Sequence, residues 1–145
     1  MLTVGQLLDG KGRQVWSVQL DSTVFEALRV MAHKEIGALL VLDGESVVGI
    51  LSERDYARKI ALEGRASRYT PVTDIMSRQV LSVSLRHTVH ECMALMTTHK
   101  VRHLPVLEQG RVVGMISIGD LVKSIIAEQE FVIEQMTNYI AGTMA

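Results

Sequence analysis

A short motif of chemically active side chains occurs twice in this chain. Ser52 stands three residues before Asp55, and Ser117 stands three residues before Asp120, each pair after an apolar run. A serine followed at this spacing by a carboxylate can form a capping box, in which each side chain satisfies a backbone N–H at a helix start. A helix start also favours a phosphate, and a carboxylate there can accept hydrogen bonds from a ribose diol. The motif therefore predicts a helix cap, a nucleotide site, or both.

A glycine precedes each motif, Gly49 in the first and Gly114 in the second. Glycine at these places would let a ligand or a neighbouring backbone approach closely. It is equally typical of a bulge in a strand. The sequence leaves both interpretations open.

The two motifs belong to a long internal repeat. Residues 13–60 align with residues 78–125 at a constant offset of 65, and 19 of the 48 aligned pairs are identical. Such a repeat indicates one structural unit used twice. A single copy of about 60–70 residues would be marginally stable alone, because small domains bury a smaller share of their surface. We therefore expect the two copies to pack on each other.

Each copy is predicted to fold as strand, helix, strand, strand, helix. Capping boxes at Thr23 and Thr88 begin the first helices, whose apolar residues recur at i, i+3, i+4 and i+7. A β-hairpin of short apolar strands follows in each copy. Pro105 has no N–H to donate, so its strand should be an edge or be paired on one side there. The other predicted elements are short strands at 15–18 and 80–83, second helices from Glu53 to about Leu62 and from Ile118 onward, and apolar turns at 4–8 and 72–76.

The chain is accordingly predicted to be an α/β (α+β) protein with an extended C-terminal helix. Copy one carries three extra residues, Gly10-Lys11-Gly12. The helix that follows the second copy has an apolar stripe, which needs either its own domain or a second subunit to cover it; we favour a homodimer. The predicted boundaries are repeat one at 3–62, a linker at 63–71, repeat two at 72–126 and a C-terminal helical extension at 127–145.

Composition excludes several classes of function. The net charge is −1, so no global field attracts nucleic acid or an acidic membrane surface. No apolar run reaches the length of a membrane span, and the N-terminus does not resemble a signal peptide, so we expect a cytoplasmic protein. Cys92 is the only cysteine and lies on an apolar helical face, which favours a buried small residue over a nucleophile.

No pattern typical of an enzyme is present. The remaining histidines do not stand at metal-ligand spacing from carboxylates or the cysteine. The chain also has no phosphate-binding Gly-Lys-Ser/Thr loop and no recognisable nucleophile with its base. We expect no catalytic residues, no metal site and no enzyme activity.

The order and duplication of these motifs resemble a tandem pair of CBS domains, as in stand-alone CBS domain-containing proteins. The resemblance covers roughly residues 3–126. It is carried by a Ser-Val strand start, a Thr-Val-x-Glu helix start, the run Arg102-His103-Leu104-Pro105-Val106 and Gly-x-x-Ser-x-x-Asp. It implies two βαββα repeats related by a pseudo-twofold axis, with clefts between them for adenosine ligands such as AMP, ADP, ATP, NAD(H) or S-adenosylmethionine.

The resemblance also implies roles for individual residues. The aspartates would bind the ribose hydroxyls and the serines would help to hold ribose or phosphate. The phosphate would meet basic residues that differ between the copies, although a solvated surface charge or a structural histidine remains an alternative for them. The implied residues are Asp55, Asp120, Ser52 and Ser117 for ribose; Arg54, Arg102 and His103 for phosphate; and Val18, Ile36, Ala38, Val83, Val101 and His103 for the adenine.

The leading functional hypothesis is a regulatory module that binds an adenine nucleotide and signals in trans. It would require no cofactor beyond that ligand and would act through dimer geometry or a regulated partner protein. The alternative is a structural protein–protein interaction module with vestigial clefts, in which the C-terminal helix carries the function.

Overall fold

A computed structural model describes residues 2–144 and divides the chain into two compact units. The first-repeat unit is continuous and covers residues 14–81. The second-repeat unit combines the described residues of 1–13 with those of 82–145. The apolar segments 4–8 and 72–76 come just before the aligned stretches 13–60 and 78–125. Each of them therefore belongs to the unit of the other repeat. The predicted boundaries 3–62 and 72–126 describe the sequence repeats, and the compact units are divided at other positions.

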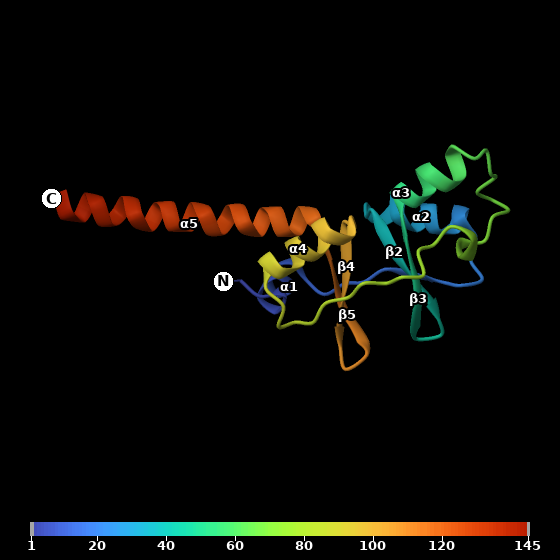
Figure 1. Cartoon of the computed structure of the whole chain (residues 1–145), viewed down its shortest axis with the longest axis horizontal. Helices are drawn as coiled ribbons and strands as arrows, with labels where there is room; N and C mark the ends of the chain where they lie inside the picture. Colours follow the sequence, from blue (N-terminus) through green and yellow to red (C-terminus); the bar gives the residue numbers. More distant parts are fainter. Residues whose placement is uncertain (1, 145) are drawn as a thin grey trace. The chain divides into compact units, whose positions relative to one another are not determined.

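The first-repeat unit contains a three-stranded sheet in the order β1-β2-β3. Figure 1 labels its hairpin strands β2 and β3. β1 is parallel to β2, and β2 is antiparallel to β3 across the hairpin. The predicted strand-helix-strand-strand-helix order is confirmed, although the second helix widens into a π-helix after one turn. The elements are β1 (Ser17–Gln19), α2 (Val24–Lys34), β2 (Ala38–Asp43), β3 (Ser46–Ser52), α3 (Glu53–Tyr56), the π-helix η1 (Ala57–Ala61) and the 3₁₀-helix η2 (Val72–Asp74).

The second-repeat unit contains a two-stranded antiparallel hairpin, β4-β5. A separate helix from the N-terminal segment joins this unit, and the last helix runs unbroken through the predicted C-terminal extension (Figure 1). The elements are α1 (Val4–Lys11), α4 (Val89–His99), β4 (His103–Glu108), β5 (Arg111–Ser117) and α5 (Ile118–Met144).

The first helix of each repeat begins with the predicted capping box. The hydroxyl of Thr23 accepts from the backbone N–H of Glu26, and the Glu26 carboxylate accepts from that of Thr23. Thr88 and Glu91 repeat the arrangement. The predicted apolar stripes are also confirmed, because their central residues are buried: Val24, Ala27 and Met31 in α2, and Val89, Cys92 and Met96 in α4.

The strand predicted at 80–83 is wrong for most of its length, and Pro105 explains the difference. Only Val83 forms a bridge, parallel to Val106. In the first repeat the backbone N–H of Leu40 donates to the carbonyl of Trp16 and extends the parallel ladder. Pro105 aligns with Leu40 and has no N–H, so this bond has no counterpart in the second repeat. Pro105 still accepts a hydrogen bond from the backbone N–H of Val83 over 3.1 Å, and its strand β4 lies at an edge of the two-stranded sheet, as predicted.

Both repeated glycines lie beside a bulge and against the segment that completes their unit. The strand register shifts next to Gly49 and next to Gly114. A Cβ on Gly49 would lie 2.5 Å from Met76 Sδ, and one on Gly114 would lie 2.7 Å from Leu8 Cδ1. Close packing of the protein's own side chains, together with the bulge, therefore accounts for the two glycines.

We expect Gly49→Ala to lower the free energy of unfolding by about 1–3 kcal/mol, because the added methyl overpacks the core. The added methyl would also lie 3.1 Å from the carbonyl oxygen of Ser77. This oxygen belongs to the backbone and cannot turn away as the end of a side chain can. Gly114→Ala should cost less, since it meets only the terminal carbons of Leu8. Urea unfolding of both variants tests this order. Gly10→Ala is the control, because nothing lies within 4 Å of its added methyl.

α5 leaves large apolar side chains in solvent along much of its length. Ile133 and Met136 are 61% and 60% exposed. Large apolar side chains that gather in solvent on one surface usually mark an interaction site. The apolar stripe predicted from the sequence is therefore present and uncovered in this chain. Its exposed members are Val122, Ile126, Phe131, Val132, Ile133, Met136, Tyr139 and Ile140.

Candidate functional site

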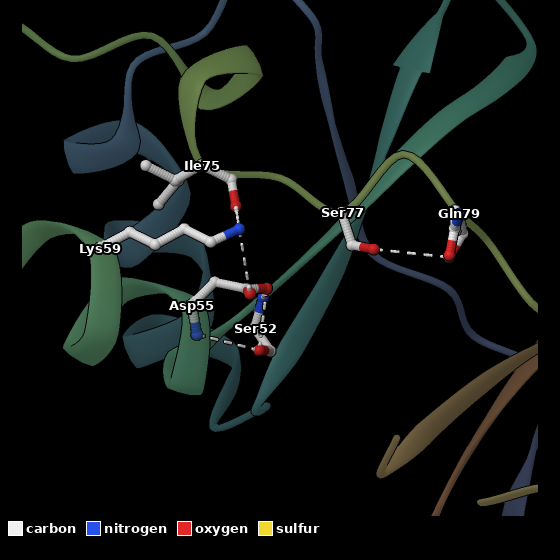
Figure 2. Close-up of polar contacts among 6 residues, drawn as sticks. All are labelled: Ser52, Asp55, Lys59, Ile75, Ser77 and Gln79. Carbon is white, nitrogen blue, oxygen red and sulfur yellow. Dashed lines mark hydrogen bonds and ion pairs between the residues drawn. The ribbon is translucent and has the colours of Figure 1, made fainter. Parts of the chain in front are cut away.

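In the first-repeat unit, the motif forms the predicted capping box at the start of α3 (Figure 2). The backbone N–H of Ser52 donates to Asp55 Oδ2 over 3.0 Å, and the backbone N–H of Asp55 donates to Ser52 Oγ over 3.2 Å. The Ser52 hydroxyl also donates to Asp55 Oδ2 over 3.0 Å. The cap fixes the position of the carboxylate.

A lysine that the sequence analysis did not single out stands beside this carboxylate. Lys59 Nζ lies 3.8 Å from Asp55 Oδ1 and donates to the carbonyl oxygen of Ile75 over 2.9 Å (Figure 2). Ile75 belongs to residues 72–76, the segment that completes this unit. The lysine thus links the carboxylate to that segment. Lys59 stands four residues after Asp55, a spacing that brings two side chains together on a helix. This spacing is the sequence feature that could have predicted the contact.

The second-repeat unit builds the same turn at the start of α5. The backbone N–H of Ser117 donates to Asp120 Oδ2 over 2.8 Å, and that of Asp120 donates to Ser117 Oγ over 3.2 Å. Lys11 Nζ donates to the same Asp120 Oδ2 and to the carbonyl oxygen of Met115, each over 2.5 Å. A lysine therefore pairs with the motif's aspartate in this unit too.

The two lysines occupy positions that are not equivalent in the repeat. Lys59 lies on the same helical segment as its aspartate, whereas Lys11 is contributed by α1. The residue that aligns with Lys59 is Ser124, whose Oγ is buried without a hydrogen-bond partner among the described residues. Lys11 belongs to the three extra residues of copy one. That insertion was the only sequence signal for it, because α1 reaches Asp120 through long-range packing.

The first residues of β2 and β4 lie beside the motif. Ala38 is the strand partner of Ser52, and His103 is the strand partner of Ser117. The carbonyl of Arg102 accepts from the backbone N–H of Ile118 over 2.9 Å, which holds the segment before β4 against the start of α5. The structure therefore brings the predicted ribose and phosphate residues of the second repeat together. Arg54 is exposed on α3 next to Asp55 in the first repeat.

The residues predicted for adenine lie in or beside the strands that carry these turns. Val18 pairs with Val41 in the first-repeat sheet, and Val83 bridges to Val106 in the second-repeat unit. Val18 and Ile36 are half-buried against the core of the first-repeat unit, and Val101 is half-buried just before β4. Their role toward adenine stays a prediction.

His103 is surrounded by the charged groups of this site. Burial lowers the pKa of His103 from its ordinary value, the cations Lys11 and Arg102 lower it further, and Asp120 opposes them. The imidazole is therefore neutral at pH 7 and offers a hydrogen bond rather than a positive charge. The basic side chains that act on it are Lys11 and Arg102.

We expect stability to fall as the pH decreases from about 6.5, the ordinary histidine pKa, toward the lower pKa of folded His103. In this window the unfolded chain binds a proton that the folded chain does not. His103→Gln should remove this part of the pH dependence. Urea unfolding at several pH values measures it, and NMR titration of the ring protons locates the pKa. A His103 midpoint above 6.5 would contradict the expectation.

Asp120 titrates in a separate, more acidic window. Its partial burial raises the pKa, but hydrogen bonds from Lys11 and Ser117 and the charge of Lys11 outweigh that effect, so the pKa lies below its ordinary value. The carboxylate is therefore ionised at neutral pH. Cys92 behaves oppositely, because burial raises the pKa of its thiol to about 11 and leaves it a poor nucleophile.

A pocket of about 870 Å³ adjoins Asp120 in the second-repeat unit. It lies between α1 and α5, and Lys11, Asp120 and Ser124 all line it. The volume falls in the range of small-molecule sites in proteins. Val83, Val101 and His103 are not among its lining residues, so it lies on another side of Asp120.

Within residues 2–144, no three histidine, cysteine or carboxylate side chains gather as metal ligands would. None of the helices described there combines the length and apolar character needed to cross a membrane.

Comparison with known proteins identifies the family. The CBS domain model matches residues 12–62 and 72–127. The chain is 34% identical to CBS domain-containing protein CBSX3, mitochondrial, of Arabidopsis thaliana, over 97% of this chain and 72% of that protein. It is 31% identical to CBS domain-containing protein YhcV of Bacillus subtilis, over 90% and 85%. A solved structure of a protein with CBS domains from Burkholderia ambifaria is 51% identical, with a TM-score of 0.84 over 88% of this chain and 96% of that one. The chain belongs to the CBS domain family and carries two of its domains in tandem.

Proposed function

We propose that this chain is a non-catalytic regulatory module that binds an adenine nucleotide at the Ser-x-x-Asp turn of each repeat. Tandem CBS domains are commonly regulatory or signal-transduction modules. The finer proposal, a ligand such as AMP, ADP, ATP or NAD(H), rests on the second-repeat turn. A cytoplasmic location and signalling to a partner protein remain predictions.

The cluster around Asp120 carries the proposal. One ionised carboxylate, two basic side chains and a neutral imidazole gather at the N-terminus of a 27-residue helix. The carboxylate suits a ribose diol, whereas Arg102 and Lys11 suit a phosphate. A helix N-terminus adds partial positive charge for the same anion. A phosphorylated nucleoside satisfies both kinds of group at once.

Native mass spectrometry of the purified protein is the first experiment, because a retained nucleotide would give the ligand and its stoichiometry together. Calorimetry with AMP, ADP, ATP, NAD and S-adenosylmethionine follows. We expect at least one of them to bind at millimolar concentration or below. If none of the five binds the wild-type chain, the proposal is wrong.

The exposed stripe of α5 favours an additional role in self-association. Ile126, Ile133 and Ile140 recur every seven residues and remain exposed, a spacing typical of a coiled-coil seam. We infer that α5 pairs with α5 of a second copy in a homodimer. Sedimentation equilibrium at micromolar concentration should give a dimer for the wild type and a monomer for Ile133→Glu. The interaction-module alternative predicts instead that truncation after Ala127 abolishes regulation while nucleotide addition has no effect.

A further inference from the structure

In each unit, one lysine joins the motif's aspartate to a backbone carbonyl. In the first-repeat unit, Lys59 forms an ion pair with Asp55 and donates to the carbonyl oxygen of Ile75. In the second-repeat unit, Lys11 donates to Asp120 and to the carbonyl oxygen of Met115. The two lysines come from non-equivalent positions. A similar contact has thus been built twice from different parts of the chain, which shows that it is not a by-product of the repeat.

The contact occupies one of the two oxygens of the Asp120 carboxylate, and a ribose diol that donates one hydroxyl to each oxygen would use both. Lys11 Nζ and the backbone N–H of Ser117 both donate to Asp120 Oδ2. A ribose hydroxyl that approaches this oxygen must share it with the ammonium or displace it. An unphosphorylated nucleoside offers the displaced ammonium no anion in exchange. A phosphate does, and it forms a charge-assisted hydrogen bond of comparable strength.

Lys11 is able to make this exchange. Its side chain is 37% exposed, whereas that of Asp120 is 20% exposed, so the ammonium is the more accessible partner. It stands at the C-terminal end of α1, followed by Gly12 with φ +105°, where the chain leaves the helix. Both partners also line the pocket between α1 and α5, next to the Ser124 hydroxyl, for which residues 2–144 supply no hydrogen-bond partner. A ligand that displaces the ammonium therefore finds space and further polar groups beside it.

We propose that Lys11 is the specificity-determining residue of the second-repeat site and makes it prefer a phosphorylated nucleoside to the free nucleoside. The inference rests on the ribose-binding role proposed above for Asp120. In the empty site Lys11 holds the carboxylate, and in the loaded site it binds the ligand's phosphate. A nucleoside that binds breaks the ion pair between Lys11 and Asp120 without replacing it. A nucleotide replaces that ion pair with the contact between Lys11 and its phosphate.

Calorimetry with AMP and adenosine tests the inference in the full chain carrying Asp55→Ala, which isolates the second-repeat site. Adding Lys11→Met should weaken AMP binding by about tenfold, the worth of one charge-assisted hydrogen bond. Adenosine binding should stay the same or tighten, because its competitor is gone. The ratio of the two affinities therefore changes, which a merely structural lysine would not cause. Lys11→Arg should largely keep the wild-type ratio.

Arg111→Met is the control. It removes one positive charge from the same unit at the hairpin end of β5, and Arg111 neither lines the pocket nor pairs with Asp120. Both affinities should be unchanged in this variant. Thermal unfolding confirms that each variant is folded, and Lys11→Gln replaces Lys11→Met if the latter is not.

Two results would overturn the inference for different reasons. Equal weakening of AMP and adenosine by Lys11→Met, or no effect on either, contradicts a selective role for Lys11 while leaving the site in place. Failure of the Asp55→Ala parent to bind either compound contradicts nucleotide binding at Asp120 itself, and the inference falls with it.

Discussion

Leu8→Ala is expected to destabilise the second-repeat unit by about 2–5 kcal/mol, the usual cost of truncating a fully buried leucine. Leu8 precedes the aligned stretch 13–60 of the first repeat, yet it is 0% exposed and its methyl carbons lie against Gly114 of β5. The backbone holds it there as well. The N–H of Val4 donates to the carbonyl of His87, and that of Gly5 donates to Leu85.

Hydrogen exchange resolved by residue distinguishes the two units. Leu8→Ala should reduce protection in β4 and β5, whereas Met76→Ala, at the corresponding place in the other unit, should reduce protection in β2 and β3. Leu62→Ala is the control for the substitution itself, because Leu62 is 80% exposed. Loss of protection in β2 and β3 upon Leu8→Ala would contradict the assignment of α1 to the second repeat.

Asp120→Ala and Asp55→Ala are each expected to weaken nucleotide binding at their own site by about 100-fold. Each substitution removes two charge-assisted hydrogen bonds to the ribose diol. Calorimetry should therefore report about half the wild-type stoichiometry for each single variant if both sites are occupied. The loss of stability should be only that of a helix cap, roughly 0.5–2 kcal/mol.

Glu91→Ala is the control that distinguishes the loss of a helix cap from the loss of nucleotide binding. Glu91 is the carboxylate of the capping box at α4 and accepts the backbone N–H of Thr88, as Asp120 accepts that of Ser117. Its removal should cost a similar amount of stability without changing nucleotide affinity. Unchanged affinity in both aspartate variants would show that the two turns are helix caps and nothing more.

The features that the sequence predicted correctly depend on local interactions. Capping boxes join residues three apart, so Thr23, Thr88 and the two Ser-x-x-Asp motifs could be placed from their spacing alone. The hairpins followed from short apolar runs around a turn. Pro105 even contained the reason for the missing strand at 80–83, because the absent N–H removes one bond of the parallel ladder.

The features that the sequence did not reveal depend on contacts between distant segments. The repeat alignment pairs Lys59 with Ser124 and has no counterpart for Lys11, so it could not show that a lysine reaches each aspartate. The low pKa of His103 likewise follows from burial and from the nearby Lys11. The sequence left open whether His103 contacts phosphate or is a structural histidine, and it could not show which charges surround the ring.

The exchange of leading segments constrains how such a chain could have arisen. In each unit, the space beside Gly49 or Gly114 is filled by a segment that precedes the other repeat. A single ancestral repeat folded alone would lack that helix or turn. Two such chains would complete each other only by trading segments, which is domain swapping. Neither repeat could then be deleted without leaving the other's core incomplete.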